Sequence, residues 1–228
     1  MSDTTQAVFV RIEGVLTARG VRAAAAYLAA NAAGLRERAL RLGHLAWTAP
    51  VYEVLGQTDR VLANRLAYLA LRNMSEDRIA ELADEYWDNV LRQGVLQDGV
   101  ELLRKARAEK KRVVLLGDSI ETIVRPLIDH LRQRGNVDDY VCNRLEFRDG
   151  FATGRLVDPV VGGHDGGKFV TEYARKHDID LTASVAYGAH GPDALMLAAV
   201  GRPCAVNPDY TLRRAAREAG WPVMDYHV

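Results

Sequence analysis

The fold is decided by the stretch Arg112-Val-Val-Leu-Leu-Gly117, an apolar run between a charged residue and a glycine. Such runs are typical of strands that are buried on both faces of a parallel sheet. Toward the carboxyl end, strand and helix patterns alternate: a helix over 120–133, a strand near 140–142, a helix over 168–177, a strand over 184–188, a helix from Asp193 and a strand over 203–206. This alternation predicts an α/β fold with an open parallel sheet.

Toward the amino end, residues 6–12 form another β-branched and aromatic run, which stops at Gly14. This pattern predicts a buried strand that enters a tight turn. Residues 21–93 are instead rich in Ala, Leu and Arg at helical spacing, and a further helix is expected over 98–111. The helical block is punctuated at Pro50, Gly56 and residues 73–75, where we expect helix boundaries.

We therefore predict a helical cap at residues 20–93 that is inserted into a core formed by residues 1–19 and 94–228. The aromatic residues of the cap are expected to belong to its core: Trp47, Tyr52, Tyr68, Tyr86 and Trp87. The cap also carries segregated charge, with arginines before residue 72 and an acidic stretch after residue 75. Such a surface is either solvated or a docking face for a protein partner or an anionic surface.

The composition excludes several classes of protein. The 228 residues are 48% hydrophobic and 26% charged, as in ordinary globular proteins. Thirty basic and thirty acidic residues cancel, which argues against nucleic-acid binding by bulk charge. Cys142 and Cys204 lack the spacing of a zinc site or a disulfide framework. With no transmembrane segment and no targeting signal recognised, we expect a cytoplasmic protein.

Ligands of open α/β sheets bind where parallel strands end. The segments that follow the expected strands are 11–15, 117–121, 162–168 and 188–193. Together they resemble the haloacid dehalogenase (HAD) superfamily, subfamily IB, which is phosphoserine-phosphatase-like. The resemblance covers nearly the whole chain and is most specific in its last third, at residues 145–156, 184–188, 193–197, 200–203, 205–209 and 220–222. It implies a HAD-like Rossmannoid core with a parallel sheet and a C1-type helical cap after the first strand. Within it, Asp149-Gly150 predicts a hairpin.

The resemblance also implies a chemistry, which is phosphate-ester hydrolysis through an aspartyl-phosphate. Family members use an Asp nucleophile, a second Asp two residues later as general acid and base, a phosphate-binding hydroxyl and Lys, and Mg²⁺. This sequence has Arg11 at the nucleophile position, Glu13 at the acid-base position, Gly117 in place of the hydroxyl residue and Ala189 in place of a metal-binding Asp. Lys168 and Asp193 match the family pattern.

These substitutions predict a pseudophosphatase. A guanidinium cannot attack phosphorus, and a hard divalent cation prefers carboxylates to a fixed positive charge. We therefore predict that the ancestral Mg²⁺ site is lost and that no cofactor is bound. The crevice would then bind phosphate or another small anion through the candidate residues Arg11, Glu13, Asp118, Ser119, Lys168, His190 and Asp193. The backbone N–H groups of residues 117–119 are expected to face that anion.

Three alternatives remain open at this point. Arg11 could pair internally with Glu13, Asp118 or Asp193 and merely close the site. The chain could be an active phosphohydrolase. It could also be a repurposed acid-base enzyme that uses Glu13, Asp118 or Asp193, with His190 and the loop residues His164 and Asp165 as further polar groups or metal ligands.

Overall fold

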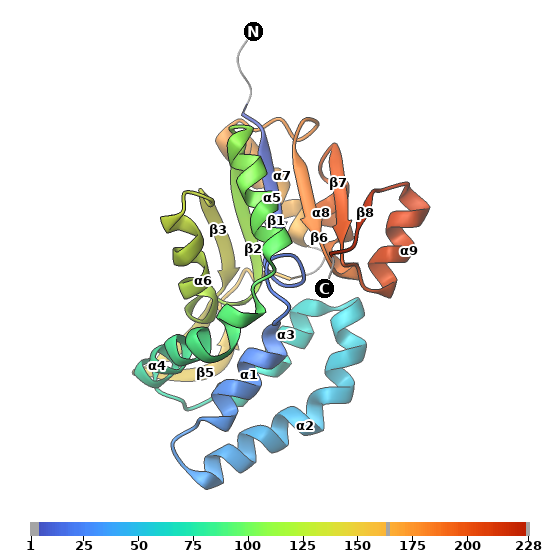
Figure 1. Ribbon diagram of the computed structural model, residues 1–228. Coiled ribbons are helices and arrows are strands. Elements are labelled where there is room, and N and C mark those ends of the chain that lie inside the picture. Colours follow the sequence, from blue (N-terminus) through green and yellow to red (C-terminus); the bar gives the residue numbers. More distant parts are fainter. Residues whose placement is uncertain (1–4, 163–164, 227–228) are drawn as a thin grey trace.

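A computed structural model of the chain describes residues 5–162 and 165–226 (Figure 1). Its central sheet has the strand order β3-β2-β1-β6-β7-β8, and every neighbouring pair is parallel. The strands are β1 Ala7–Arg11, β2 Arg112–Ile120, β3 Asp139–Asn143, β6 Val185–Gly188, β7 Arg202–Val206 and β8 Val223–Met224. The predicted open parallel sheet is confirmed, and β1, which carries Arg11, lies between β2 and β6.

Helices cover both faces of this sheet, which is why β1 and nearly all of β2 are buried. Side chains alternate along β1: Val8 and Val10 belong to one core cluster, and Ala7 and Phe9 to the other. The first cluster includes buried residues of α5 (Gln97–Ala108) and α6 (Glu121–Gln133). The second includes those of α7 (Asp165–His177), α8 (Ala194–Ala198) and α9 (Tyr210–Ala219). Each β1 residue is therefore buried.

A helical block follows β1, as predicted, and lies below the carboxyl ends of the strands in Figure 1. It contains α1 (Val21–Ala30), α2 (Leu35–Thr58), α3 (Arg60–Tyr68), α4 (Glu76–Tyr86) and short turns that end at Gly94. The two connections to the core run side by side, because the Ala18 N–H donates to the Gly94 carbonyl at 3.0 Å and the Leu96 N–H to the Leu16 carbonyl at 2.9 Å. The residue boundaries of the cap remain a prediction.

The predicted hairpin is confirmed as β4 (Leu145–Arg148) and β5 (Phe151–Leu156). Asp149 and Gly150 form its turn with φ of 50° and 78°. Positive φ at both turn residues suits the twist of a two-residue hairpin, which explains the Asp-Gly sequence. The hairpin packs beside the helical block, where the Asn73 N–H donates to the Ala152 carbonyl at 2.8 Å.

The expected helix boundaries at Pro50 and Gly56 are wrong, because α2 continues through both residues to Thr58. Proline removes one N–H donor from a helix and leaves the carbonyl four residues earlier, here that of Ala46, without its partner. Both Pro50 and Ala46 are exposed, so water can solvate that carbonyl. The helix therefore tolerates a residue that would break it in a buried position.

The expectation that the cap aromatics belong to its core holds for Tyr68 and Tyr86, which are buried, and is wrong for Trp47. The Trp47 side chain is 84% exposed. It lies on α2, which packs on α1 and α3 and forms the outer edge of the helical block (Figure 1). Spacing alone placed Trp47 on an apolar face of a helix, and it could not tell which faces of α2 are covered.

Within the residues that the structure describes, none of the helices combines the length and the apolar character needed to cross a lipid bilayer.

Candidate functional site

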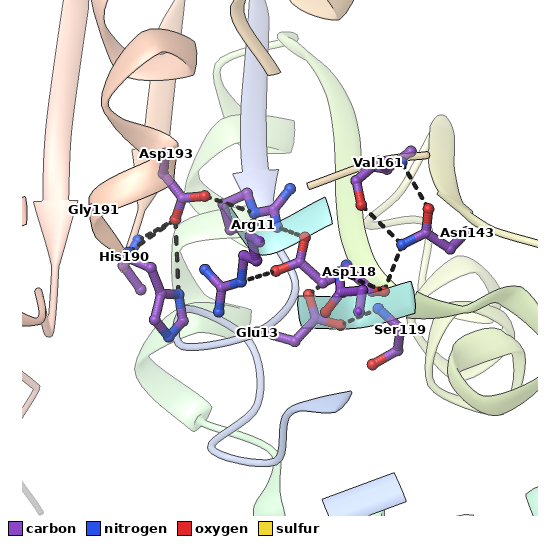
Figure 2. Close-up of polar contacts among 12 residues, drawn as sticks. Arg11, Glu13, Asp118, Ser119, Asn143, Val161, His190, Gly191 and Asp193 are labelled. Atoms are coloured by element: carbon purple, nitrogen blue, oxygen red, sulfur yellow. Dashed lines mark hydrogen bonds and ion pairs between the residues drawn. The ribbon is translucent and has the colours of Figure 1, made fainter. Parts of the chain in front are cut away.

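Arg11 is the centre of the candidate site. It ends β1 and is 2% exposed, and its guanidinium forms an ion pair with Asp118 (Figure 2). On the other side, Arg11 Nε lies 3.1 Å from Asp193 Oδ1. Asp118 belongs to β2, and Asp193 follows β6 in the short turn Gly191–Asp193. Because β2 and β6 flank β1, the sheet order itself brings a carboxylate to each side of the guanidinium.

Asp193 is further fixed by backbone donors. Its Oδ2 accepts hydrogen bonds from the N–H groups of Ala189 and His190, both at 2.9 Å. The same carboxylate thus shapes the turn after β6 and neutralises Arg11. Ser119, in β2, is 3% exposed and contributes its backbone N–H to the site.

Arg60 joins the helical block to this network. It begins α3, and its Nε lies 2.7 Å from Asp118 Oδ2, so that Asp118 lies between two guanidinium groups. The backbone carbonyl of Asp118 accepts a hydrogen bond from Asn143 Nδ2 at 2.6 Å, and the same amide donates to the Val161 carbonyl at 2.8 Å. The polar network therefore connects the cap, the core strands β1, β2 and β3, and the loop near residue 161.

Neither Arg60 nor Asn143 was predicted from the sequence. Asn143 ends a parallel strand, so the strand-end rule that selected the other residues would have found it. Arg60 carries no such signal, because its position over β2 depends on how the cap packs against the core.

The structure corrects the expected anion site at residues 117–119. The backbone N–H groups of Asp118 and Ser119 each donate to the carboxylate of Glu13 at 2.9 Å. Glu13 itself is 2% exposed. The anion that these donors bind is therefore an internal side chain, and an external anion would have to displace Glu13.

One of the predicted binding residues, Lys168, is not brought into the network, and another, His190, joins it through its backbone N–H and a long side-chain approach to Asp193. Lys168 lies on α7, is exposed and forms no ion pair with any residue in the described part of the chain. His190 Nδ1 is 3.8 Å from Asp193 Oδ2, a long approach for a group that is 29% exposed. His164 lies outside the described residues, and Asp165 is exposed at the start of α7.

The charges of the network nearly balance. Arg11 and Arg60 face the carboxylates of Glu13, Asp118 and Asp193, which leaves one net negative charge. Burial alone would lower the pKa of Arg11, but the surrounding carboxylates, first that of Asp118, outweigh burial and raise that pKa above its usual value. Arg11 is therefore a permanent cation in this site. The predicted internal pairing is confirmed for Asp118 and Asp193.

The residues present do not fit Mg²⁺. This ion needs oxygen ligands in octahedral geometry, usually from one or two carboxylates. Here the guanidinium of Arg11 occupies the space between Asp118 and Asp193, and Ala189 offers no side-chain oxygen. Gly14 packs against Ala189 so closely that a Cβ on Gly14 would lie 2.3 Å from the Ala189 Cβ. Among the described residues no cluster of His, Cys, Asp and Glu is arranged to hold a metal.

A cavity of about 470 Å³ lies over this network, between the cap and the strand ends. Its lining includes Glu13, Tyr52, Arg60, Asp118 and His190. Arg60 Nη1 is buried and has no hydrogen-bond partner among the residues that the structure describes. Since a buried guanidinium donor without a partner is costly, this atom favours a ligand with an acceptor oxygen.

The network predicts a specific acid sensitivity. Burial alone would raise the pKa of Asp193, but Arg11 outweighs it and holds that pKa well below its usual 3.8. The ionised Asp193 carboxylate contributes its full stabilisation at pH values above 3.8, its usual pKa. This stabilisation is lost as the pH falls toward the pKa of Asp193 in the folded protein. We expect the difference in unfolding free energy between the wild type and Asp193→Asn to be constant from pH 7 to pH 5 (about 3 kcal/mol). Below about pH 4 this difference in unfolding free energy should shrink. Urea denaturation at each pH measures it. A difference that persists unchanged at pH 2.5 would contradict this assignment.

Comparisons with known proteins agree with this architecture. Residues 14–198 match the family model of haloacid dehalogenase-like hydrolases. A relative from Streptomyces azureus, the "Inhibition of morphological differentiation protein", is 30% identical over 71% of this chain and 57% of its own length. A phosphoserine phosphatase of Mycobacterium tuberculosis is 28% identical over 78% of this chain and 57% of its own length.

One solved structure, a phospho-aspartyl intermediate analogue of phosphoserine phosphatase, superimposes with a TM-score of 0.72 at 13% identity and covers 98% of this chain and 94% of that chain. At this identity the likeness shows the fold alone. The chain spans about 57% of the length of the two curated relatives.

Proposed function

The chain belongs to the haloacid dehalogenase-like hydrolase family, and on this premise we propose that it binds a small anionic ligand in the cavity between cap and core without hydrolysing phosphate esters by the family route. One observation carries this proposal. The residue at the nucleophile position, Arg11, is a buried cation paired with both Asp118 and Asp193. It has no lone pair for attack on phosphorus.

The pairing of Arg11 also removes the other parts of the family mechanism from use. Asp193 is paired with one guanidinium and Asp118 with two, so a metal ion would have to break at least one ion pair for each carboxylate that it gained. Glu13, at the acid-base position, is held by two backbone N–H groups. These contacts support a site that binds a ligand by its shape and charge and does not hydrolyse it. The name of the Streptomyces azureus relative refers to the inhibition of differentiation rather than to hydrolysis, which also favours a regulatory role.

The ligand contact we propose is Arg60. Arg60 lines the cavity and its buried Nη1 lacks a hydrogen-bond partner in the described part of the chain, whereas Arg11 is paired with a carboxylate on both sides. A carboxylate or phosphate oxygen would satisfy this donor by a charge-assisted hydrogen bond. The carboxylates that line the cavity near Arg60 are themselves paired, so they do not compete for Nη1.

Titration of phosphoserine and inorganic phosphate into the wild type, followed by assay of phosphate release in the same samples, tests the proposal. We expect measurable binding and no phosphate release above background, with or without Mg²⁺. Arg60→Gln should weaken binding by at least about tenfold, because it removes a charge-assisted hydrogen bond. Arg65→Gln is the matched control: Arg65 also lies on α3, but its side chain is 47% exposed and pairs with Asp158. If the wild type bound neither phosphoserine nor phosphate, the proposed anion binding would be wrong. If it hydrolysed phosphoserine robustly with Mg²⁺, the proposed absence of hydrolysis would be wrong.

The names of the relatives favour a second function, which is phosphomonoester hydrolysis by an active enzyme. The carboxylate best placed for acid-base work is Glu13, because it lines the cavity and is not bound by a guanidinium. Phosphate release by the wild type that disappears in Glu13→Gln would establish this function in place of the first. Release that survives Glu13→Gln would point to a contaminating phosphatase, to be removed by further purification.

A further inference from the structure

Another, smaller cavity of about 210 Å³ lies where the helical block returns to the core. One part of its wall comes from the turns that follow α4, through Trp87 and Arg92. Another part comes from α6 and its C-cap residue, through His130 and Arg134. This cavity shares no lining residue with the cavity over Arg60, so the candidate site does not account for it.

Only basic groups bring charge to this smaller cavity. Among the described residues, its lining contains Arg92, His130 and Arg134 but no Asp or Glu. The side chains of Arg92 and Arg134 are exposed, and neither forms an ion pair in the part of the chain that the structure describes. Neighbouring positive charges repel one another, so an anion placed between them would be stabilised by all three groups.

His130 contributes a ring that is free to bind. It packs against the Trp87 ring with the centroids 5.5 Å apart, and its nitrogens have no hydrogen-bond partner among the residues described. Burial lowers the pKa of His130, and the positive charges of Arg134 and Arg92 lower it further. A protonated imidazole and two guanidinium groups are donors that bind phosphate and carboxylate oxygens by charge-assisted hydrogen bonds.

The end of α6 does not by itself explain this cluster of charge. Basic residues near a helix C-terminus often interact with its free carbonyl groups. Here the Leu131 carbonyl already accepts hydrogen bonds from the N–H groups of Arg134 and Asn136, at 3.3 and 3.1 Å. Arg92 does not belong to α6. It follows a π-helical turn at Trp87–Leu91, and such turns are frequent at functional sites.

We propose that this cavity binds a free inorganic oxyanion of the size of phosphate or sulfate between Arg92, His130 and Arg134. Its volume favours a small ion, since sites for drug-sized ligands measure roughly 300–1,000 Å³. The proposal does not depend on the ligand proposed for Arg60, because different residues line the two cavities.

Sulfate is the probe for the first test, because it does not titrate near the pKa of histidine. An NMR pH titration of the full chain follows the His130 imidazole, whose signal is identified by its absence in His130→Gln. Sulfate should raise the pKa of His130 by about 1, since a nearby negative charge favours the protonated ring. NaCl at the same ionic strength should have no such effect.

Two arginine variants test whether the response arises in this cavity. Arg92→Gln and Arg134→Gln should each weaken sulfate binding by at least about tenfold, because each removes a charge-assisted hydrogen bond. Both side chains are exposed, so we expect the variants to fold, which circular dichroism verifies. Arg175→Gln is the matched control: Arg175 is also exposed, but it lies on α7, which packs on the other face of the sheet.

Hydrogen exchange tests the geometry of the bound ion. Because the proposed donors come from both the returning chain and α6, the ion should hold these two elements together. Amide exchange at residues 87–94 should therefore slow in saturating sulfate, and Arg92→Gln should abolish the slowing. If exchange stayed unchanged while His130 responded, the ion would not lie between Arg92 and His130, and the proposed geometry would be wrong.

Arg60→Gln separates this inference from the proposed function, since it should leave the response of His130 to sulfate unchanged. An unchanged pKa of His130 in sulfate overturns the proposal, and so does a rise that survives both Arg92→Gln and Arg134→Gln. Inorganic phosphate and glycerol phosphate distinguish a free ion from a phosphate ester. If glycerol phosphate saturated the His130 response at a lower concentration than phosphate, the assignment to an inorganic oxyanion would be wrong.

Discussion

Arg11→Met is expected to lower the free energy of unfolding by about 3–5 kcal/mol, the range for removing one partner of a buried ion pair. The loss arises at Asp193. Asp118 keeps its second guanidinium partner, Arg60, at 2.7 Å, whereas Asp193 would lose its guanidinium partner and keep two backbone N–H donors and the His190 side chain at 3.8 Å. Asp193 is 2% exposed, so its unpaired carboxylate would remain without solvation. Urea denaturation followed by circular dichroism measures the change.

A surface ion pair is the matched control for this prediction. Arg213 pairs with Asp225 at 2.6 Å, but these side chains are 41% and 59% exposed. Solvent screening limits such pairs to about 0–1 kcal/mol, so Arg213→Met should change little. If Arg11→Met and Arg213→Met had the same small effect, Arg11 would not be held by the buried network that the distances indicate.

The double variant Arg11→Met, Asp193→Asn separates the ion pair from the packing of Arg11. Once Arg11 is absent, neutralising Asp193 removes a buried charge that has lost its partner. The double variant is therefore expected to be more stable than Arg11→Met alone. Purely additive losses would show that the two residues act independently.

Part of this site could be predicted from the sequence because the topology decides it. Arg11, Asp118 and Asp193 each follow or end an apolar run, and the ends of parallel strands meet at one edge of a sheet. The internal pairing of Arg11 was one of the alternatives that the residue types allowed. Lys168 was carried over from the family pattern, and its place on an exposed face of α7 depends on packing that the pattern does not contain.

What the sequence could not predict depends on contacts between distant elements. Arg60 reaches Asp118 only because α3 docks over the strand ends, and no local pattern marks that docking. The N–H groups of residues 118 and 119 were expected to face a bound anion, but they donate to the Glu13 side chain. The exposure of Trp47 has the same origin, since helical periodicity identifies an apolar face without showing what covers it.

Restoring the missing carboxylates should create a divalent-cation site. In Arg11→Asp, Ala189→Asp, one guanidinium and one methyl group are replaced by two carboxylates, a change of three charge units toward the negative. Repulsion between the buried carboxylates would then disfavour the folded protein unless a cation binds. We expect Mg²⁺ to raise the melting temperature of this variant by several degrees. At a Mg²⁺ concentration one hundred times the dissociation constant, binding adds about 2.7 kcal/mol to the free energy of unfolding. The wild type should not respond beyond the effect of NaCl at equal ionic strength.

Gly117→Ser is left out of this variant on structural grounds. A Cβ on Gly117 would lie 2.8 Å from Cys142 Sγ and 3.0 Å from Ile12 Cδ1, so the side chains of Cys142 and Ile12 must shift before a serine fits there. The cation site and the phosphate site are thus separable, and the Mg²⁺ titration tests the first without the second. A wild type stabilised by Mg²⁺ as strongly as the variant would show that Arg11 does not exclude the ion. A variant that is folded, by circular dichroism, yet indifferent to Mg²⁺ would show that charge at positions 11 and 189 is insufficient to form the site.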